Sequence, residues 1–195
     1  MIRPVTSGRM CRWLCTVALS LVFCFPAVAA PGDDDMARFM VDKGLLDRLE
    51  QVRTRVADTA SDLVLTAMGF LGVPYRRGGN TVESGFDCSG FVRAMYGQTI
   101  GLILPRRANE QAAATQTIDR KDLQPGDLVF FNTMRKAFSH VGIYVGEGKF
   151  IHSPKPGAQV RVEDMGVAYW ARRFDGARRV LSADAPPPDV VAIQP

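Results

Sequence analysis

The sequence contains few of the side chains that bind metals or form disulfides, with 4 cysteines and 2 histidines among 195 residues. Three of the cysteines precede residue 25, so beyond residue 30 Cys88 stands alone and no disulfide can form within that part of the chain. Neither a CxxC nor an HExxH spacing occurs, which argues against the usual zinc motifs. Cys88 is therefore either a small buried hydrophobic residue or a reactive thiol.

Long apolar runs and a strong excess of charge are also missing. The one strongly apolar run, Trp13–Phe25, is about thirteen residues long and too short to span a bilayer comfortably, which excludes a multi-pass membrane protein. The 24 basic residues face 20 acidic ones, and three of the basic residues lie within residues 1–12. The remaining excess of about +1 does not supply the clustered basic face of a nucleic-acid-binding protein, so no nucleic-acid partner is expected.

An export signal is predicted at the amino terminus. Residues 1–12 carry arginines and no acids, the apolar run Trp13–Phe25 follows, and Ala27-Val28-Ala29 supplies a small-residue cleavage site. We expect cleavage after Ala29, export to the periplasm and no stable membrane insertion after cleavage. A lipid anchor at Cys24 is the alternative, which is disfavoured because no small residue directly precedes it.

The rest of the chain predicts helices first and strands later, which is typical of an α+β domain. Helices are expected over 36–57, with a break allowed at Gly44, and over 59–70, 88–96 and 169–174. Strands are expected over 128–131, 141–145, 150–151, 159–162 and 178–181. The predicted organisation is a signal peptide over 1–29, a helical extension over 30–60, a main domain over 61–182 and a disordered Pro-rich tail over 183–195.

Both histidines of the chain fall in the predicted strand region. Residues 139–145 alternate so that His140 and Gly142 share one face, and Gly146-Glu147-Gly148 suits a three-residue hairpin loop. In that register Gly142 pairs with His152, and the two histidines become diagonal neighbours on one face. A two-residue loop would instead place them on opposite faces.

Cys88 is predicted to lie in the first turn of a helix, because Asp87 is a good N-cap and an apolar helical stripe follows. The partial positive charge of a helix N-terminus stabilises a thiolate. If the helix packs against the polar face of the histidine strand, Cys88 and His140 form a thiolate–imidazolium pair, with His152 orienting His140. Such a pair predicts a bell-shaped dependence of activity on pH.

A zinc site formed by Cys88, His140 and His152 is an alternative, since these residue types bind zinc and three ligands leave a position for water. The absence of local metal-binding motifs disfavours it, and no metal or other cofactor is expected.

Six short motifs occur in order between about Ser61 and Leu181. They are Gly72-Val73-Pro74-Tyr75-Arg76-Arg77-Gly78-Gly79, Gly85-Phe86-Asp87-Cys88-Ser89-Gly90-Phe91-Val92, Leu104-Pro105-Arg106, Leu123 to Phe131, Ser139 to Gly146, and Phe150-Ile151-His152. Their order and gaps resemble the NlpC-type family of cell-wall cysteine peptidases. Tyr169-Trp170 and Arg178–Leu181 resemble the close of the domain in its lipoprotein-like peptidoglycan endopeptidase branch.

The resemblance implies a papain-like α+β fold for the NlpC-type catalytic domain over 61–182, in which a helical layer carries the nucleophile on a small antiparallel sheet. By motif it assigns Cys88 as nucleophile, His140 as general base and acid, and His152 as the polar third member of the site. The substrate-binding positions that it implies are Tyr75, Asp87, Ser89, Arg77 and Arg106. Arg77 stands where the family often has an aromatic residue, so either a substrate carboxylate or solvent is its partner.

The function that follows from the resemblance is a peptidoglycan endopeptidase, which hydrolyses an amide bond of the stem peptide or crosslink through a thioester. Peptidoglycan stem peptides are the expected partner, together with a regulatory protein. A related amidase or acyltransferase with another substrate and a non-catalytic wall-binding or adaptor protein remain as alternatives. The helix predicted over 36–57 has no counterpart that the resemblance assigns.

Overall fold

The structure is a computed structural model, and it describes Arg38 and residues 44–180. The predicted signal peptide over 1–29 and the tail over 183–195 lie outside the described residues. Within them, the helices are α2 (Leu45–Met68), α3 (Cys88–Ile100), α4 (Ala108–Ala113), the 3-10 turn η1 (Arg120–Asp122) and α5 (Ala168–Ala171). The strands are β1 (Asn80–Thr81), β2 (Gly85–Phe86), β3 (Gln116–Ile118), β4 (Leu128–Phe131), β5 (His140–Gly146), β6 (Lys149–His152), β7 (Arg161–Asp164) and β8 (Phe174–Arg179). No helix in this part of the chain is long and apolar enough to cross a membrane.

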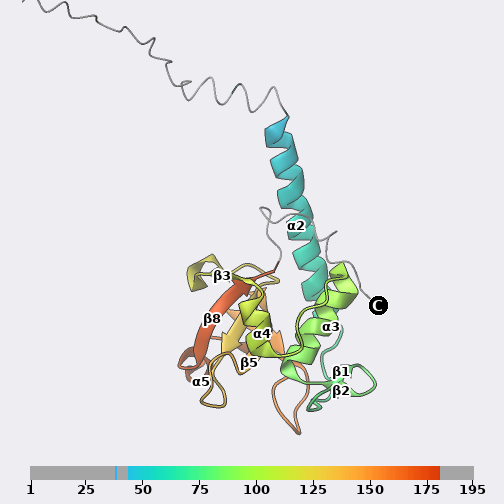
Figure 1. Ribbon diagram of the computed structural model, residues 1–195, viewed down its shortest axis with the longest axis vertical. Helices are drawn as coiled ribbons and strands as arrows, with labels where there is room; N and C mark the ends of the chain where they lie inside the picture. The colour runs from blue at the N-terminus through green and yellow to red at the C-terminus, as the bar shows by residue number, and fades with distance from the viewer. Residues whose placement is uncertain (1–37, 39–43, 181–195) are drawn as a thin grey trace, which may run out of the picture. The chain divides into compact units, whose positions relative to one another are not determined.

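The main sheet is antiparallel and combines strands in the order β3-β8-β4-β5-β6-β7, while β1 and β2 form a separate small sheet. The carboxyl end of α2 lies beside α3, and both contribute to the core that packs against this sheet (Figure 1). Cys88 is the first residue of α3. The predicted α+β class, with a helical layer that carries Cys88 on an antiparallel sheet, is confirmed.

The two faces of the main sheet have different partners. Val141 of β5 belongs to a core shared with Phe91 of α3, whereas Phe131 and Trp170 belong to a second core on the other face. His140 precedes Val141 in the strand, so its side chain lies on the second face, where its ring stacks on Trp170. Packing of α3 on the histidine face, the condition considered above for a contact between thiol and imidazole, therefore does not occur.

Helix α2 is one continuous element, so the prediction of two helices separated near Asp58-Thr59 was wrong. No glycine or proline interrupts this stretch, and the Thr59 hydroxyl donates a hydrogen bond to the Arg55 carbonyl at 2.7 Å, which lets threonine sit inside a helix. The described helix begins at Leu45, directly after the break allowed at Gly44, and residues 36–37 and 39–43 of the predicted helix lie outside the described residues. Gly44 takes a left-handed conformation with φ of 60° and forms the N-cap of α2.

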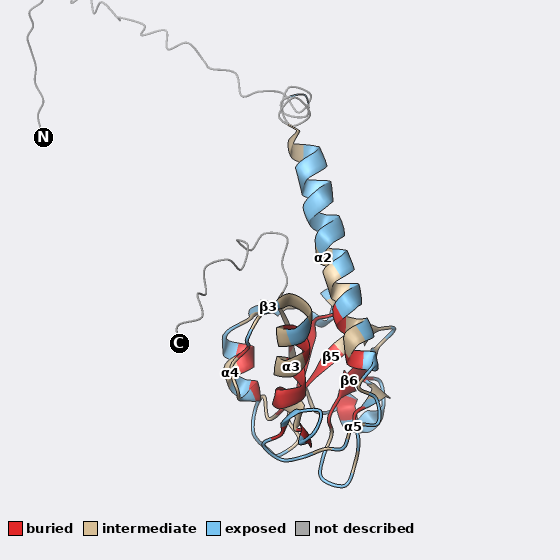
Figure 2. Cartoon of the chain, turned by 90° about the vertical axis from the view of Figure 1, so that its right-hand side faces the viewer, coloured by how far each residue is buried: buried red, intermediate tan, exposed pale blue. Residues whose placement is uncertain are grey.

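Burial changes along α2. Leu63 and Ala67 near its carboxyl end are buried in the core shared with α3, while most of the residues from Leu46 to Thr59 are exposed (Figure 2). Leu49 and Val52 belong to the exposed part, so the apolar stripe predicted over the first half of this helix does not enter the core.

The β5–β6 hairpin differs from the predicted hairpin in its loop but not in its inner register. Its loop is the two-residue turn Glu147-Gly148, in which both residues have positive φ, as two-residue hairpins require. A bulge next to this turn restores the register, so that Ile143 pairs with Ile151. His140 and His152 therefore share one face, although a two-residue loop without the bulge would have separated them.

Several short elements were missed or misplaced. Strands β1, β2 and β3 and helix α4 were not predicted, because elements of two to six residues carry too little periodicity to be recognised. The helix expected over 169–174 is the shorter α5, and Phe174 begins β8, which starts earlier than the strand expected from Arg178. Leu181, the expected end of that strand, lies outside the described residues.

Gly142 provides a test of this hairpin. A Cβ at this position would lie 2.7 Å from the Phe150 ring and 2.9 Å from the Ile151 carbonyl oxygen, so Gly142→Ala must displace β6, which carries His152. We expect the substitution to lower the free energy of unfolding by about 1–3 kcal/mol. Urea denaturation checks this, with Gly97→Ala in α3 as control. A Cβ at Gly97 meets only a side-chain methyl at 3.3 Å, and alanine in a helix interior is expected to be about 0.5–1 kcal/mol more stable than glycine.

Candidate active site

Cys88 is positioned by the capping of α3. Asp87 precedes the helix in an extended conformation, and its Oδ1 accepts a hydrogen bond from the Gly90 backbone N–H at 2.7 Å. Its Oδ2 accepts from the Gly78 N–H at 3.0 Å, which ties the preceding loop to the helix. The N-cap predicted for Asp87 is confirmed, and Cys88 stands in the first turn, where backbone N–H groups have no partner within the helix.

The Asp87 carboxylate is held by Arg106. The guanidinium donates from Nη1 to Oδ1 at 3.0 Å and from Nη2 to Oδ2 at 2.6 Å, and Nη1 also reaches the Ser89 hydroxyl at 3.1 Å. This two-point ion pair raises the pKa of Arg106. Both carboxylate oxygens of Asp87 are thus occupied within the protein. Asp87, Ser89 and Arg106, three of the predicted substrate-binding residues, are thus bonded to one another beside Cys88.

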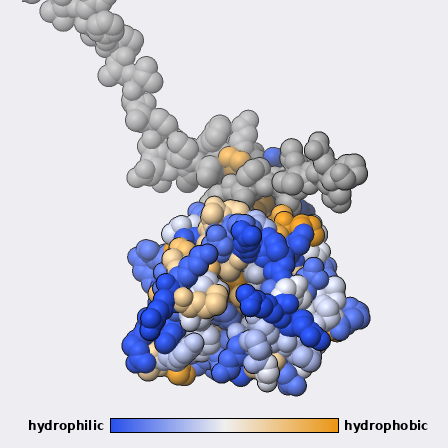
Figure 3. Space-filling view, turned by 60° about the horizontal axis from the view of Figure 1, so that its bottom comes forward, coloured by the Kyte–Doolittle hydropathy of each residue, from blue (hydrophilic) through white to orange (hydrophobic). Residues whose placement is uncertain are grey.

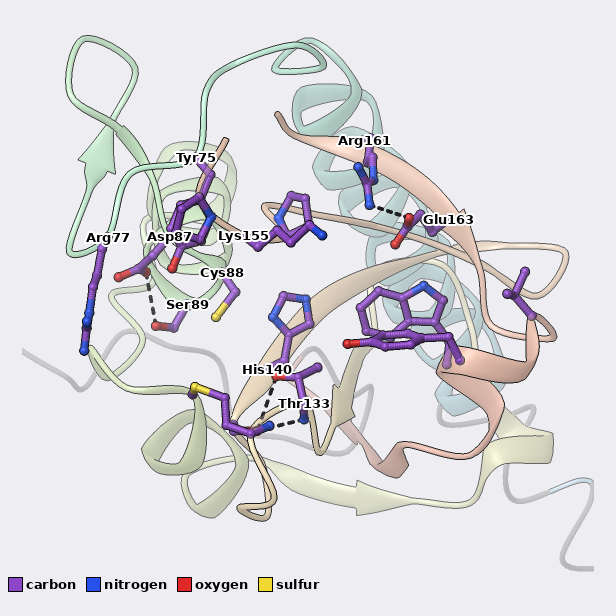
Figure 4. A pocket seen from close by; sticks show the side chains of 17 residues that line it. Tyr75, Arg77, Asp87, Cys88, Ser89, Thr133, His140, Lys155, Arg161 and Glu163 are labelled. Atoms are coloured by element: carbon purple, nitrogen blue, oxygen red, sulfur yellow. Dashed lines mark hydrogen bonds and ion pairs between the residues drawn. The ribbon is translucent and has the colours of Figure 1, made fainter. Parts of the chain in front are cut away.

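The two histidines form a direct hydrogen bond. His140 Nε2 and His152 Nδ1 lie 2.6 Å apart, and both side chains are almost entirely buried. Because Nε2 of His140 is engaged with His152, the other ring nitrogen, Nδ1, is the one left for a reaction partner. Figure 4 shows the Cys88 side chain beside the His140 ring, and both residues line the same pocket. The first residue of α3 therefore meets the first residue of β5 at the end of the strand, even though α3 covers the opposite face of the sheet.

Aromatic rings surround the histidine pair. The indole of Trp170 stacks on His140 with ring centroids 5.5 Å apart and meets His152 edge-on at 5.1 Å. Phe150 lies 4.6 Å from His152, centroid to centroid. This apolar enclosure keeps water from the imidazoles and restricts their rotation. Trp170 was noticed in the sequence only as part of a closing motif.

Glu163 is the residue at this site that the sequence interpretation missed. Its Oε2 lies 2.9 Å from Nε2 of His152, and its Oε1 accepts from Arg161 Nη2 at 2.7 Å. The hydrogen bond with His152 is the largest cause that lowers the pKa of Glu163 to about 2. The one available signal was the alternation of Arg161 and Glu163 along a strand, and that strand was predicted to end at residue 162.

The electrostatic environment favours uncharged groups at rest. Burial, and after it the Asp87 carboxylate, raises the pKa of the Cys88 thiol to about 11. Burial, followed by the neighbouring His152, holds the pKa of His140 well below its usual value of 6.5. Both shifts act against the predicted thiolate–imidazolium pair. Burial is the largest cause of each shift, because it disfavours the charged form of both groups.

A pocket of about 670 Å³ opens in front of Cys88 and His140. The residues that line it include Tyr75, Arg77, Asp87, Cys88, Ser89, Met134, His140, Lys155, Arg161, Glu163, Tyr169 and Trp170. Burial, and next the nearby Cys88, raises the pKa of the Tyr75 phenol. Among the described residues, neither Arg77 nor Lys155 forms a salt bridge. The face shown in Figure 3 is mostly hydrophilic, with less polar residues gathered between hydrophilic ones.

The alternative of a zinc site does not fit this geometry. The two histidine nitrogens that face each other share a hydrogen bond at 2.6 Å instead of pointing to a common third position. Within residues 44–180, no group of three or more His, Cys, Asp or Glu side chains is arranged to hold a metal ion.

The Asp87–Arg106 pair generates a prediction. Arg106→Ala leaves the Asp87 carboxylate, whose side chain is 15% exposed, without its cation. We expect the free energy of unfolding to fall by about 1–3 kcal/mol, the range for hydrogen bonds to charged groups. Urea denaturation measures the change. The neighbouring Arg107, whose side chain is 77% exposed, supplies the control, since Arg107→Ala should change stability by no more than about 0.5 kcal/mol. Equal losses in the two variants would contradict the expected contribution of the Asp87–Arg106 pair.

Comparisons with known proteins agree with this architecture. The chain is 44% identical over 115 residues to the murein DD-endopeptidase MepH of Escherichia coli K12, which covers 57% of this chain and 42% of MepH. It is 39% identical over 137 residues to the E. coli K12 murein DD-endopeptidase MepS/murein LD-carboxypeptidase, covering 70% of this chain and 68% of that protein. The chain thus spans less than half of MepH and about two thirds of MepS.

Solved structures show the same fold. An NlpC/P60 family protein from Bacillus cereus ATCC 10987 matches with a TM-score of 0.59 and 37% identity, over 63% of this chain and 40% of that one. The NlpC/p60 domain of the peptidoglycan hydrolase SagA matches with a TM-score of 0.55 and 34% identity, over 62% of this chain and 97% of that domain. The family model of the NlpC/P60 family covers residues 72–179. The resemblance found in the sequence is confirmed, and the chain belongs to the NlpC/P60 family.

Proposed function

We propose that this protein is a cysteine-type peptidoglycan endopeptidase that hydrolyses an amide bond of the stem peptide or its crosslink. The observation that carries the proposal is the juxtaposition of the Cys88 thiol with His140, whose ring is held by His152, at the floor of an open pocket. The relatives described above include murein endopeptidases and a peptidoglycan hydrolase, which supports peptidoglycan as the substrate.

In the proposed reaction, Nδ1 of His140 takes the proton of the Cys88 thiol as the sulfur attacks the amide carbonyl carbon. The resulting oxyanion needs hydrogen-bond donors, and the Cys88 backbone N–H and the Tyr75 hydroxyl are the candidates. His140 then gives its proton to the leaving amine, and a thioester forms on Cys88. Water, deprotonated by His140, attacks the thioester carbonyl. The C–S bond breaks, His140 returns the proton to the Cys88 sulfur, and the carboxylic acid product is released.

Two cations give the pocket a preference for acidic peptides. Arg77 and Lys155 line the pocket, and within the described part of the chain they have no anionic partner. Stem peptides carry free carboxylates, for which a guanidinium and an ammonium are suitable partners. Of the five substrate-binding positions expected from the sequence, Tyr75 and Arg77 keep that role in this proposal.

Export belongs to the proposal as well. The arginine-containing segment, apolar run and Ala27-Val28-Ala29 site near the amino terminus support secretion and cleavage after Ala29. A periplasmic location would place the enzyme beside its substrate. A regulatory protein partner remains part of the expectation, because a wall hydrolase has to be restrained by its cell.

The nucleophile is tested by digesting purified peptidoglycan with the wild-type chain and with Cys88→Ala. We expect new fragments from the wild type alone, because the variant cannot form a thioester. Mass spectrometry of the fragments names the bond, since loss of dimeric fragments indicates the crosslink and shortened monomers indicate the stem. Circular dichroism confirms that the variant is folded. Equal cleavage by both proteins would exclude Cys88, and no cleavage by either would favour an adaptor or another substrate.

The pH dependence follows from the shifted pKa values. The pKa of His140 is lowered, so the base stays unprotonated down to below pH 6.5, and kcat/KM should rise with pH through that low value. The thiol has a pKa of about 11, so its ionisation should not change kcat/KM near neutrality. We therefore expect kcat/KM to stay level to at least about pH 9. Assays with a soluble stem peptide measure this. A decline between pH 7 and 9 would instead indicate the bell-shaped profile of a thiolate–imidazolium pair.

A further inference from the structure

Glu163 extends the pair of histidines to a third residue. It lies on β7, next to the strand that carries His152, and Arg161 pairs with His152 in the register of the two strands. Residues two apart on a strand share a face, so the carboxylate of Glu163 is a diagonal neighbour of the imidazole. The result is a continuous line of groups, in which His140 Nε2 and His152 Nδ1 are 2.6 Å apart and His152 Nε2 and Glu163 Oε2 are 2.9 Å apart.

The chemistry of these groups sets the direction of every hydrogen bond in the line. An ionised carboxylate can only accept, so the proton between Glu163 and His152 belongs to His152 Nε2. In a neutral imidazole the other nitrogen is then an acceptor, so His152 Nδ1 accepts from His140 Nε2–H. The remaining nitrogen of His140, Nδ1, carries a lone pair and no proton.

We propose that Glu163 is a positioning residue that acts through His152 to keep the unprotonated nitrogen of His140 directed at Cys88. The inference rests on the proposed function in taking Cys88 as the nucleophile. Without Glu163, His152 would be free to carry its proton on Nδ1. His140 would then have to accept at Nε2 and hold its own proton on Nδ1, where it could not accept the thiol proton.

The proton balance of the first step is simple. The S–H bond of Cys88 breaks, and its proton binds to Nδ1 of His140, which becomes an imidazolium. The Nε2–H of His140 stays donated to His152, and the Nε2–H of His152 stays donated to Glu163. No proton needs to move along the line, so the carboxylate acts by charge and orientation and remains ionised, consistent with its lowered pKa.

Arg161 keeps the carboxylate in place. Its guanidinium binds Oε1 of Glu163 at 2.7 Å and leaves Oε2 for His152. The Glu163 side chain is 24% exposed, so it is partly shielded from solvent and more effective on the buried histidines than a surface carboxylate would be.

Other charged and titratable groups also face the histidines and influence their pKa values. The flanking groups are Tyr75 and Arg77 from the loop before β1, Asp87 and Cys88 at the start of α3, Lys155 from the β6–β7 loop, and Arg161 and Glu163 from β7. Glu163 is the anion bonded to the pair, and its charge favours the protonated form of His140. Removing that charge should therefore lower the pKa of His140 and not raise it.

Nitrogen-15 NMR of the full chain gives the first test, because the chain has only 2 histidines. In the wild type we expect both rings as Nε2–H tautomers. Glu163→Gln keeps an acceptor oxygen and should largely keep these tautomers, whereas Glu163→Ala should populate the Nδ1–H forms. Asp164→Asn is the matched control. Its side chain lies on the opposite face of β7 and caps the Gly166 N–H at 2.6 Å. Wild-type tautomers in Glu163→Ala would overturn the proposal.

Reactivity of Cys88 gives the second test and does not depend on peptidoglycan. The rate of alkylation by iodoacetamide is followed by mass spectrometry of the peptide that contains Cys88. At neutral pH we expect Glu163→Ala, which loses the favoured tautomers, to slow the reaction about tenfold, a fraction of the 10²–10⁴-fold that a general base contributes. Glu163→Gln, which keeps the tautomers but not the charge, should slow it less, and Asp164→Asn should leave it unchanged. Thermal unfolding shows whether each variant remains folded.

The alkylation rate is also measured as a function of pH, and the acid limb is the range in which the rate falls as His140 becomes protonated. The position of this limb separates a positioning role from a merely structural one. Loss of the Glu163 charge should move the limb in Glu163→Gln to lower pH, whereas a loosened fold would change the rate without moving it in that direction. An unchanged rate and limb would overturn the inference. If Glu163→Gln behaves as expected but the wild type cleaves no peptidoglycan, the proposed substrate fails and the role of Glu163 stands.

Discussion

The hydrogen bond between His140 and His152 depends on a single feature of the backbone, the register in which β5 pairs with β6. A shift of one residue would turn one imidazole to the opposite face of the sheet. The register is set by a two-residue turn together with a bulge, and it is held by Gly142, where any side chain would collide with β6. The orientation of the base, the enclosure by Trp170 and the contact with Glu163 all follow from it.

Enclosure of the histidine pair has a cost as well as a benefit. Aromatic rings exclude water and fix the ring planes, but a dry environment disfavours the imidazolium that forms during the reaction. The carboxylate of Glu163 offsets part of this cost from a distance, since its charge favours the protonated form of His140. His152 carries this influence to His140, because it is hydrogen-bonded to Nε2 of His140 on one side and to the Glu163 carboxylate on the other.

The sequence was sufficient for the parts of the site that local patterns define. The N-cap at Asp87 and the placement of Cys88 in the first turn of α3 follow from short-range preferences, and alternation in β5 placed His140 on the correct face. The bulge, the continuity of α2 and the meeting of Cys88 with His140 around the end of the strand depend on packing between distant segments. Glu163 was missed for the same reason, since its partner His152 is eleven residues away on another strand.

Two carboxylates, Asp87 and Glu163, affect the two members of the Cys88–His140 pair differently. Asp87 adjoins Cys88, and its charge contributes to the raised pKa of the Cys88 thiol. Arg106 neutralises part of that charge while it holds the helix start in place. Glu163, beyond the second histidine, makes His140 a better proton acceptor. Burial raises the pKa of the Cys88 thiol and lowers that of His140, and both directions favour the proton on sulfur. In the proposed reaction this division of charge gives the imidazole the role of a general base toward a neutral thiol, although the thiol stands at a helix N-terminus.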